Sequence, residues 1–268
     1  MALKQDGMKI SIITASFNQG IFIEKTIQSV LGQKYSNFEH IIVDNCSTDG
    51  TSEVLERYPH LKVICEKDQG QSEALNKGFK AATGDIIGWL NADDMYLPGC
   101  FKAVLEALAQ NPKYDLVYGD CRFVDVNGKL IRVLKELDFD MFMLKYLHVL
   151  YIPTTTVFIR RKIFDEGNFL DINYHYAMDY EFFLRLAQRG YRFWHIPQLM
   201  ADFRWHQNSK SSTQAVCQKE EKEKALLAHD PLLQTLQNPL RSWMRNSFLL
   251  VARGKRTILK IFHGAYWN

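Results

Sequence analysis

The chain has 268 residues, of which 47% are hydrophobic, 13% aromatic and 24% charged. This composition is typical of a folded globular protein with a sizeable core, and it excludes a wholly disordered chain. The formal net charge of +3 is too small to indicate a nucleic-acid-binding protein, so we expect no nucleic-acid partner.

The first hundred residues alternate strand and helix patterns. Apolar, β-branched segments at 9–18, 40–47, 62–67 and 85–92 predict strands, and the stretches between them predict helices. Gly84 is placed as the stop of the third helix. Near-continuous apolar strands separated by helices are typical of a mostly parallel sheet that is covered on both faces. We therefore expect an α/β fold.

The second half is less regular. Residues 116–136 predict two strands joined at an Asn-Gly turn, and residues 153–161 predict a further strand. Residues 179–190 predict an amphipathic helix that ends at its last glycine. The segments 191–197 and 199–206 predict a strand pair.

Polar side chains lie at or just after the predicted strand ends. Ligands of parallel sheets bind beyond the carboxyl ends of the strands, so we expect these residues to share one edge of the sheet. They are Thr14, Ser16, Asn18, Asp44, Asp68, Asp93 and Asp94.

The adjacent carboxylates of Asp93 and Asp94 predict a metal site. Two such groups repel each other, and partial burial makes both ions costlier, whereas a divalent cation removes the repulsion. Oxygen ligands favour Mg²⁺ or Mn²⁺, which can bridge the oxygens of a diphosphate. The alternative is that these residues only cap a helix that starts near Pro98.

Four further residues each allow a functional and a structural interpretation. Asp44 is suited to a ribose hydroxyl or a base N–H, or to an Asx-type turn. Gln71 and Ser72 precede a helix whose first N–H groups suit a phosphate, although an ordinary capped helix fits equally well. Asp179 begins a helix and is either a general base or a helix-terminal carboxylate.

His206 follows an apolar segment near the end of the regular pattern. A lone histidine is usually structural, but an imidazole near a carboxylate-bound metal would favour Mn²⁺ or a similar ion. Among motifs with a known mechanism, the chain has no G-x-G-x-x-G, no G-x-x-x-x-G-K-[ST], no H-E-x-x-H and no G-x-S-x-G. A dehydrogenase, P-loop enzyme, zinc protease or α/β-hydrolase is therefore poorly supported.

Five stretches, in order, resemble family-2 glycosyltransferases of the type that builds bacterial polysaccharides and lipid-linked glycans. These enzymes are inverting, use nucleotide sugars and have the GT-A fold, and the resemblance covers about residues 8–212. The stretches are SIITASFNQGIFIEKTIQSVLGQKY, IIVDNCSTDGT, DQGQSEALNKGFKAATGDIIGWLNADD, MDYEFFLRLAQRG and WHQNSKS.

The resemblance implies a GT-A catalytic domain over residues 1–212. Its nucleotide-sugar-binding half would be 8–95 and its acceptor half 96–212, followed by a helical, basic C-terminal extension over 213–268. It also implies a metal-dependent enzyme that moves a sugar, with inversion, from a UDP-sugar to a hydroxyl group of a glycan or lipid-linked acceptor. The cofactor would be Mn²⁺ or Mg²⁺.

The resemblance also assigns roles to single residues. Asp179 would be the catalytic base, Asp94 the main metal ligand, and His206 would complete the metal or diphosphate site. Asp93 would lie at the ribose and diphosphate, although the family motif is read in two ways and leaves the order of the two acids open. Asn91 stands where many members carry an aspartate, and Met178 stands where they carry a glutamate. The expected nucleotide-sugar contacts are Thr14, Ser16, Asn18, Asp44, Asp68, Gln71, Ser72, Asn76, Asn91 and Asp93.

Two rival functions stay open at this point. One is a sugar-nucleotide pyrophosphorylase, which would need a glycine-rich basic loop after the first strand, where this chain has only Gly20 and a distant Lys25. The other is a non-catalytic nucleotide or glycan binder on the same scaffold.

The last forty residues lie outside the resemblance. From Pro231 to Asn268 there is no acidic residue, and arginines and lysines interleave with apolar side chains. Residues 239–268 are suited to an anionic membrane surface, or else form helices packed on the catalytic domain with a solvated basic face. Five scattered cysteines, no secretory signal and no spanning segment predict a cytoplasmic protein, peripheral at the inner face of the cell membrane if this tail binds lipid.

Overall fold

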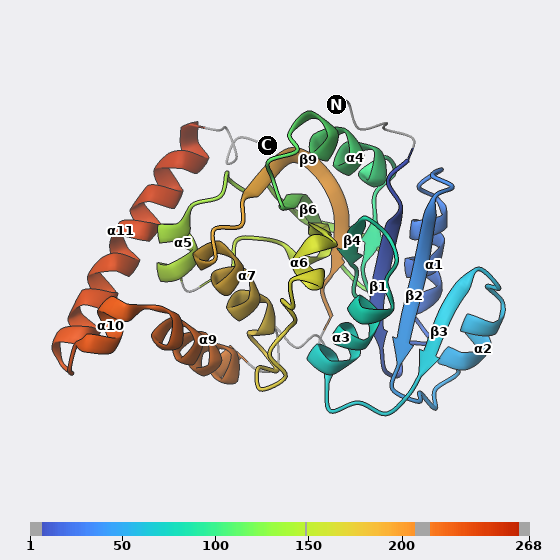
Figure 1. The fold of residues 1–268 in the computed structure, drawn as a ribbon, viewed down its shortest axis with the longest axis horizontal. Coiled ribbons are helices and arrows are strands. Elements are labelled where there is room, and N and C mark those ends of the chain that lie inside the picture. Colours follow the sequence, from blue (N-terminus) through green and yellow to red (C-terminus); the bar gives the residue numbers. More distant parts are fainter. Residues whose placement is uncertain (1–6, 148, 207–214, 263–268) are drawn as a thin grey trace.

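The computed structural model describes residues 7–147, 149–206 and 215–262 (Figure 1). Within these ranges one sheet runs through the molecule in the order β3-β2-β1-β4-β8-β6-β9-β5, and β7 pairs with β6. The strands are β1 (Ile10–Ser16), β2 (Phe38–Asp44), β3 (Leu61–Cys65), β4 (Ile86–Trp89), β5 (Met95–Tyr96), β6 (Leu116–Val124), β7 (Leu130–Leu134), β8 (Phe158–Arg160) and β9 (Phe193–Arg204).

Helices cover both faces of this sheet, because successive strand residues point to opposite sides. On one face Ile13 packs with Leu75 and Phe79 of α3, and on the other Ile12 packs with Phe101 of α4. The helical segments are α1 (Ile23–Leu31), α2 (Thr51–Glu56), α3 (Gln71–Ala81), α4 (Cys100–Gln110), α5 (Met141–Tyr146), η1 (Thr154–Thr156), α6 (Lys162–Asp165), α7 (Met178–Gln188), α9 (Ala215–His229), α10 (Pro231–Thr235) and α11 (Leu240–Phe262).

The N-terminal half is the predicted parallel sheet. Strand β1 pairs in parallel with β2 and β4, and β2 pairs in parallel with β3. In these registers Ser16 lies opposite Asp44, and Asp44 lies opposite Cys65, so the strands end at one edge. The mixed sheet therefore confirms the expected α/β class and brings the strand-end residues to a common border.

Two predictions for the second half need correction. Residues 154–156 form a 3-10 turn, and only Phe158–Arg160 of the predicted strand 153–161 is extended. The predicted strand pair at 191–206 is one curved strand, β9, which is the orange arc of Figure 1. Its pairing with β6 shifts register on both sides of Asp120, and such bulges accommodate Pro197, which has no N–H to donate.

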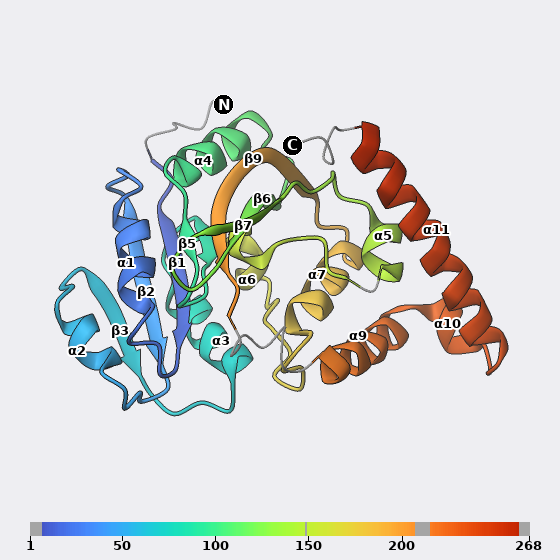
Figure 2. The same ribbon diagram turned by 180° about the vertical axis from the view of Figure 1, so that it is seen from behind.

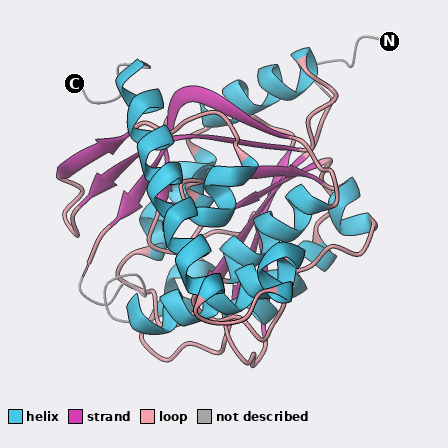
Figure 3. Cartoon of the chain, turned by 90° about the vertical axis from the view of Figure 1, so that its left-hand side faces the viewer, coloured by secondary structure: helices cyan, strands magenta, loops and turns pink. Residues whose placement is uncertain are grey.

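The C-terminal helices α9, α10 and α11 lie together on the side of the molecule away from β3 (Figures 1 and 2). Seen from that side, helices stand in front of the strands (Figure 3). Among the described residues, none of the helices is both long and apolar enough to cross a bilayer. The expected boundary at 212/213 and the end of the tail, residues 263–268, lie outside the described ranges.

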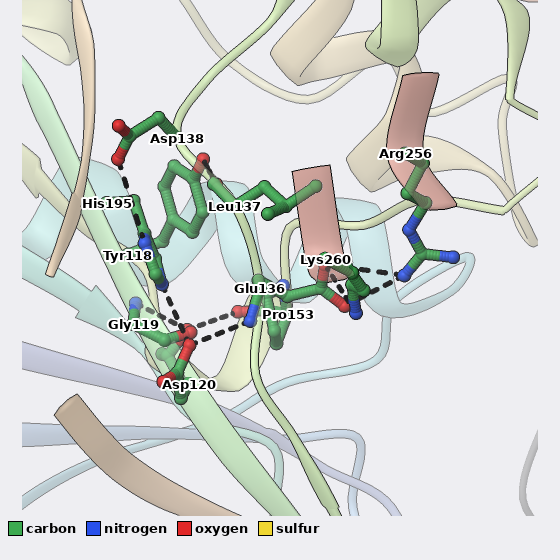
Figure 4. A network of polar contacts seen from close by, with 11 residues as sticks. Tyr118, Gly119, Asp120, Glu136, Leu137, Asp138, Pro153, His195, Arg256 and Lys260 are labelled. Atoms are coloured by element: carbon green, nitrogen blue, oxygen red, sulfur yellow. Dashed lines mark hydrogen bonds and ion pairs between the residues drawn. The ribbon is translucent and has the colours of Figure 1, made fainter. Parts of the chain in front are cut away.

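Helix α11 packs on the domain through charged as well as apolar groups. Figure 4 shows Arg256 and Lys260 reaching the buried carboxylate of Glu136, with Nη2–Oε1 and Nζ–Oε2 distances of 3.1 and 3.4 Å. Burial raises the pKa of Glu136, and the two cations act against that change. Helix α11 is therefore packed on the domain, as one of the two interpretations of the tail expected. Part of its basic face, however, is paired with Glu136 and is not solvated.

Candidate active site

A cavity of about 420 Å³ opens beyond the carboxyl ends of β1 to β4. Each of these strands sends a polar residue to it: Ser16 ends β1, Asn45 follows β2, Asp68 follows β3, and Asp93 follows β4. The opposite wall comes from the start of α7, the end of β9 and helix α9. The predicted site residues on its lining are Ser16, Asp68, Gln71, Asn91, Asp93, Asp179 and His206.

The other predicted residues do not line the cavity, because other parts of the chain occupy their polar atoms. The Thr14 hydroxyl is buried and lies 3.0 Å from Nε2 of His40. Asn76 bonds both backbone groups of Leu170, and the Ser72 hydroxyl donates to the carbonyl oxygen of Tyr174. These three residues join strands and loops, and their predicted contact with a donor is not supported by their positions.

Asn18 and Asp44 instead build the loop after β2. Oδ1 of Asn18 accepts from the N–H of Thr48. Both carboxylate oxygens of Asp44 accept from Ser47, one from its N–H and one from its hydroxyl, each at 2.7 Å. Of the two interpretations of Asp44, the structure shows the Asx-type turn. Its neighbour Asn45 reaches the cavity in its place.

The two adjacent acids point to different places. Asp94 is 1% exposed, and its oxygens accept from the N–H of Arg204, the hydroxyl of Thr155 and the amide of Asn91 at 2.7–2.9 Å. Burial, and secondarily the charge of Asp93, raises the pKa of Asp94 to about 8. The structure therefore does not place Asp94 where a metal ligand of the cavity must lie.

Asp93 takes that position. Its side chain is 23% exposed and lines the cavity, with Oδ2 lying 2.9 Å from Nε2 of His206. The His206 ring stacks on Phe22 at 5.1 Å between centroids. Carboxylate oxygen and imidazole nitrogen are ligands that suit Mn²⁺ and Mg²⁺ or similar ions, Mn²⁺ better when a histidine takes part.

Arg204, at the end of β9, holds Asp93 and His206 close to each other. The Arg204 side chain is 1% exposed, and its guanidinium donates to the carbonyl oxygens of Asp93 and Val126 at 2.8 and 2.7 Å. The strand thereby ties the loop after β4 to the segment that carries His206, two residues further on. The protein itself therefore directs the Asp93 and Asp94 side chains to different places, and no cation is needed to relieve a repulsion between them.

Asp179 lies in the first turn of α7 and lines the same cavity. Its Oδ2 accepts from the hydroxyl of Thr154 at 3.3 Å, and Oδ1 accepts from the N–H of Tyr180 at 2.7 Å. Burial raises the pKa of Asp179, and the positive charge of Lys222 opposes this. Such a carboxylate can take a proton from a hydroxyl group bound in the cavity.

The 3-10 turn η1 connects the two acidic positions. Thr154 donates to Asp179, and the next residue, Thr155, donates to Asp94. A short turn in place of the predicted strand therefore fixes both carboxylates from one point. The hydroxyls of a Thr-Thr-Thr run gave no sign of this role in the sequence.

The remaining cavity groups offer hydrogen bonds to a ligand. The buried hydroxyl of Ser16 has no hydrogen-bond partner among the described residues. Asp68 accepts from Gly70 N–H at 2.9 Å, and burial raises its pKa. Gln71 donates to Asn91 at 3.1 Å, which places two amides side by side on the wall.

Several lining residues were missed from the sequence. Asn45 directly follows the predicted Asp44, so the prediction misplaced the cavity-facing residue by one position. Thr154 lies in the segment predicted as a strand, which forms the turn η1 instead. His175 and Tyr176 come from the loop before α7 and Gln218 from α9, and none of them belongs to a recognisable motif.

Comparison with known proteins agrees with this geometry. Residues 11–167 match the profile of Glycosyl transferase family 2, which is more than half of the chain. The chain belongs to that family. The expectations of a glycosyltransferase and of the GT-A fold are thereby confirmed, and the pyrophosphorylase alternative loses its basis.

Individual relatives of the family-2 chain are similar over different lengths. TuaG of Bacillus subtilis (strain 168), named a putative teichuronic acid biosynthesis glycosyltransferase, is 30% identical over 214 residues, 76% of this chain and 81% of TuaG. Other curated glycosyltransferases match over a shorter stretch, and there the match covers only 40% and 44% of the relative's length.

Solved structures share the fold at low sequence identity. Residues 1–349 of TarS from S. aureus, in complex with UDP-GlcNAc, superpose with a TM-score of 0.66 at 18% identity, over 90% of this chain and 72% of that one. The mannosyltransferase PcManGT from Pyrobaculum calidifontis, in complex with GDP-Man and Mn²⁺, gives a TM-score of 0.57 at 17% identity, over 93% and 87%.

Proposed function

We propose that this chain is an inverting, metal-dependent glycosyltransferase that moves a sugar from a UDP-sugar to a hydroxyl group of a glycan or lipid-linked acceptor. The observation that carries the proposal is that Asp179 and the Asp93–His206 pair line one cavity at the carboxyl ends of the parallel strands. A base at this cavity could take the proton of the attacking hydroxyl, and an acid–imidazole pair at the same cavity could hold a cation that neutralises the departing diphosphate.

The strand-end groups support a nucleotide sugar as the donor. A cavity of about 420 Å³ lies in the range of small-molecule sites, and Ser16, Asn45 and Asp68 are among the polar residues that line it. TarS in its solved structure holds UDP-GlcNAc, and PcManGT holds GDP-Man. We favour uridine as the base, and the name of TuaG supports a cell-envelope polysaccharide as the product.

The residues present fit a divalent cation that is completed by its substrate. Among the described residues, no group of three His, Cys, Asp or Glu side chains could hold a metal ion alone. Mg²⁺-type sites commonly use one or two carboxylates plus substrate phosphates, so Asp93 and His206 with the donor diphosphate would suffice. Bound there, Mn²⁺ or Mg²⁺ would neutralise charge on the diphosphate, and the Mn²⁺ of PcManGT supports this choice.

The reaction is a single displacement. The Asp179 carboxylate accepts the proton of the acceptor hydroxyl, whose oxygen forms a bond to the anomeric carbon. The bond from that carbon to the diphosphate oxygen breaks on the opposite side, so the anomeric configuration inverts. Thr154 and the N–H of Tyr180 hold the Asp179 carboxylate in place for this transfer.

The test is a panel of nucleotide sugars with MnCl₂. We expect one UDP-sugar to raise the thermal midpoint of the protein clearly more than GDP-mannose or a dTDP-sugar does. A ligand stabilises the folded state in proportion to its binding free energy, so the donor that binds most tightly gives the largest shift. The same donor should release UDP slowly with water as the acceptor. Release of pyrophosphate, or no stabilisation by any donor in the panel, would contradict the proposal.

We further propose that the outer face of α11 binds an anionic membrane surface at the inner face of the cell membrane. Arg253 is exposed beside that face, and there is no acidic residue from 231 onward. Its apolar side chains recur at three-, four- and seven-residue intervals, opposite the side that packs on α5, and are 50–83% exposed. They are Leu240, Trp243, Leu250, Val251, Ile258, Ile261 and Phe262.

Liposome co-sedimentation of the full chain tests this surface. The protein should pellet with vesicles of phosphatidylglycerol and phosphatidylcholine but not with phosphatidylcholine alone, because the basic residues need an anionic surface. Glutamate at Trp243, Ile258 and Phe262 should abolish pelleting. The matched control places glutamate at Val63, Leu130 and Ile172, which are exposed apolar residues far from α11 along the chain. Equal loss in both triple variants would contradict the α11 assignment.

A further inference from the structure

The segment that leads into α7 is held by a carboxylate from the C-terminal extension. Glu221 of α9 accepts hydrogen bonds from three successive backbone N–H groups, those of His175, Tyr176 and Ala177, at 2.7–3.0 Å. One turn earlier on α9, Gln218 donates to the carbonyl oxygen of Tyr176 at 3.1 Å. Helix α9 thus hydrogen-bonds both to backbone N–H groups and to a backbone carbonyl oxygen of residues 175–177.

The segment 175–177 that α9 holds ends two residues before the proposed base, Asp179. Ala177 is the N-cap of α7, which has no side-chain cap of its own, and Asp179 lies in the first turn. A helix start without a local cap leaves N–H groups to be satisfied from elsewhere. Glu221 supplies that acceptor from a distance of more than forty residues along the chain, and so fixes the direction in which α7 begins.

We propose that α9 supports catalysis, with Glu221 as a positioning residue for the Asp179 base. This rests on the proposed function of Asp179. Helix α9 begins after the family match ends at 167, so the C-terminal extension contributes groups that the matched region does not contain.

Hydrogen exchange in the ligand-free protein tests the positioning directly. In Glu221→Gln the amides of residues 175–177 should exchange faster, because one acceptor oxygen becomes an NH₂ that faces N–H donors. The matched control is Glu220→Gln, which removes the same charge from the exposed neighbouring position of α9. Unchanged protection in Glu221→Gln would overturn the positioning role. If Glu221→Gln does not fold, Glu221→Asp, which keeps the charge but shortens the reach, is measured in its place.

Kinetics give a second readout, with UDP release from the best UDP-sugar of the panel and water as the acceptor. Glu221→Gln should lower kcat by about a hundredfold and leave the donor KM near its original value, because the base is displaced while the donor contacts stay. A variant that only loses stability would keep its kcat per folded molecule. Glu220→Gln should match the original protein in both parameters.

Failure of the inference can be told apart from failure of the proposed function. If Asp179→Asn is inactive while Glu221→Gln behaves like the original protein, only the role of α9 falls. If Asp179→Asn turns over normally, the proposed base falls, and the role of α9 falls with it.

Discussion

Asp179→Asn should abolish sugar transfer and leave donor binding nearly intact. The amide cannot accept a proton at neutral pH, but it keeps the size of the side chain. Its oxygen can still accept from the N–H of Tyr180, and its NH₂ can donate to the hydroxyl oxygen of Thr154. Loss of a general base costs about 10²- to 10⁴-fold in rate. We expect kcat to fall within that range, measured as UDP release, with the thermal shift by the donor unchanged.

The pH profile gives the same assignment a second check. Burial raises the pKa of Asp179 above its ordinary value of 3.8, with Lys222 opposing the rise. The base works only when it is ionised, so activity is full above that raised pKa and declines as the pH falls through it. The residual rate of Asp179→Asn should lack this acid limb.

Asp165→Asn is the matched control for that variant. Asp165 is an exposed carboxylate at the end of α6, and its Oδ1 lies 3.4 Å from Nη1 of Arg161. The same chemical change there should leave both rate and pH profile unaltered. Normal turnover by Asp179→Asn would contradict the assignment of the base.

The parallel half of the sheet could be predicted because its signals are local. Strands β1, β2 and β4 are short, mostly buried and largely apolar runs, each followed by polar residues, and their register is fixed by the need to bury both faces. One error there is an error of one residue, because Asp44 closes a turn while Asn45 takes the expected position. The Thr14 hydroxyl is bonded inside the domain, whereas Ser16, which was also predicted, reaches the cavity.

The other wall of the cavity depends on contacts that are distant in sequence. Arg204 orients the loop after β4 from more than one hundred residues away, and Glu221 holds the start of α7 from a helix beyond β9. A pattern of single residues carries no signal for such contacts. The same holds for η1, where packing against β6 replaces the extended conformation that its β-branched residues favour.

The choice between Asp93 and Asp94 shows what tertiary structure adds to a motif. Two adjacent acids in a loop look equivalent in sequence, but the backbone N–H of Arg204 and the hydroxyl of Thr155 draw one of them inward. The inward acid accepts three hydrogen bonds from the protein, and the outward acid lines the cavity. This division has consequences that can be measured independently of sugar transfer.

We expect Asp93→Ala to weaken metal binding and Asp94→Ala to lower the stability of the fold. Asp93→Ala, like His206→Ala, should weaken Mn²⁺ binding in the presence of UDP by about a hundredfold or more, because only two protein ligands face the diphosphate. The unfolding free energy should change by about 1 kcal/mol or less, since the Asp93–His206 pair is partly exposed. Isothermal titration with MnCl₂ and UDP measures the first quantity, and urea denaturation the second.

Asp94→Ala should instead lower the unfolding free energy by about 3 kcal/mol, because its three donors, from Arg204, Thr155 and Asn91, are left buried without an acceptor. Folded Asp94→Ala protein should bind Mn²⁺ with UDP far better than Asp93→Ala does, because the metal-facing pair is still present. The reverse pattern, with metal binding lost in Asp94→Ala and kept in Asp93→Ala, would mean that the inward carboxylate turns to the cavity when the donor binds.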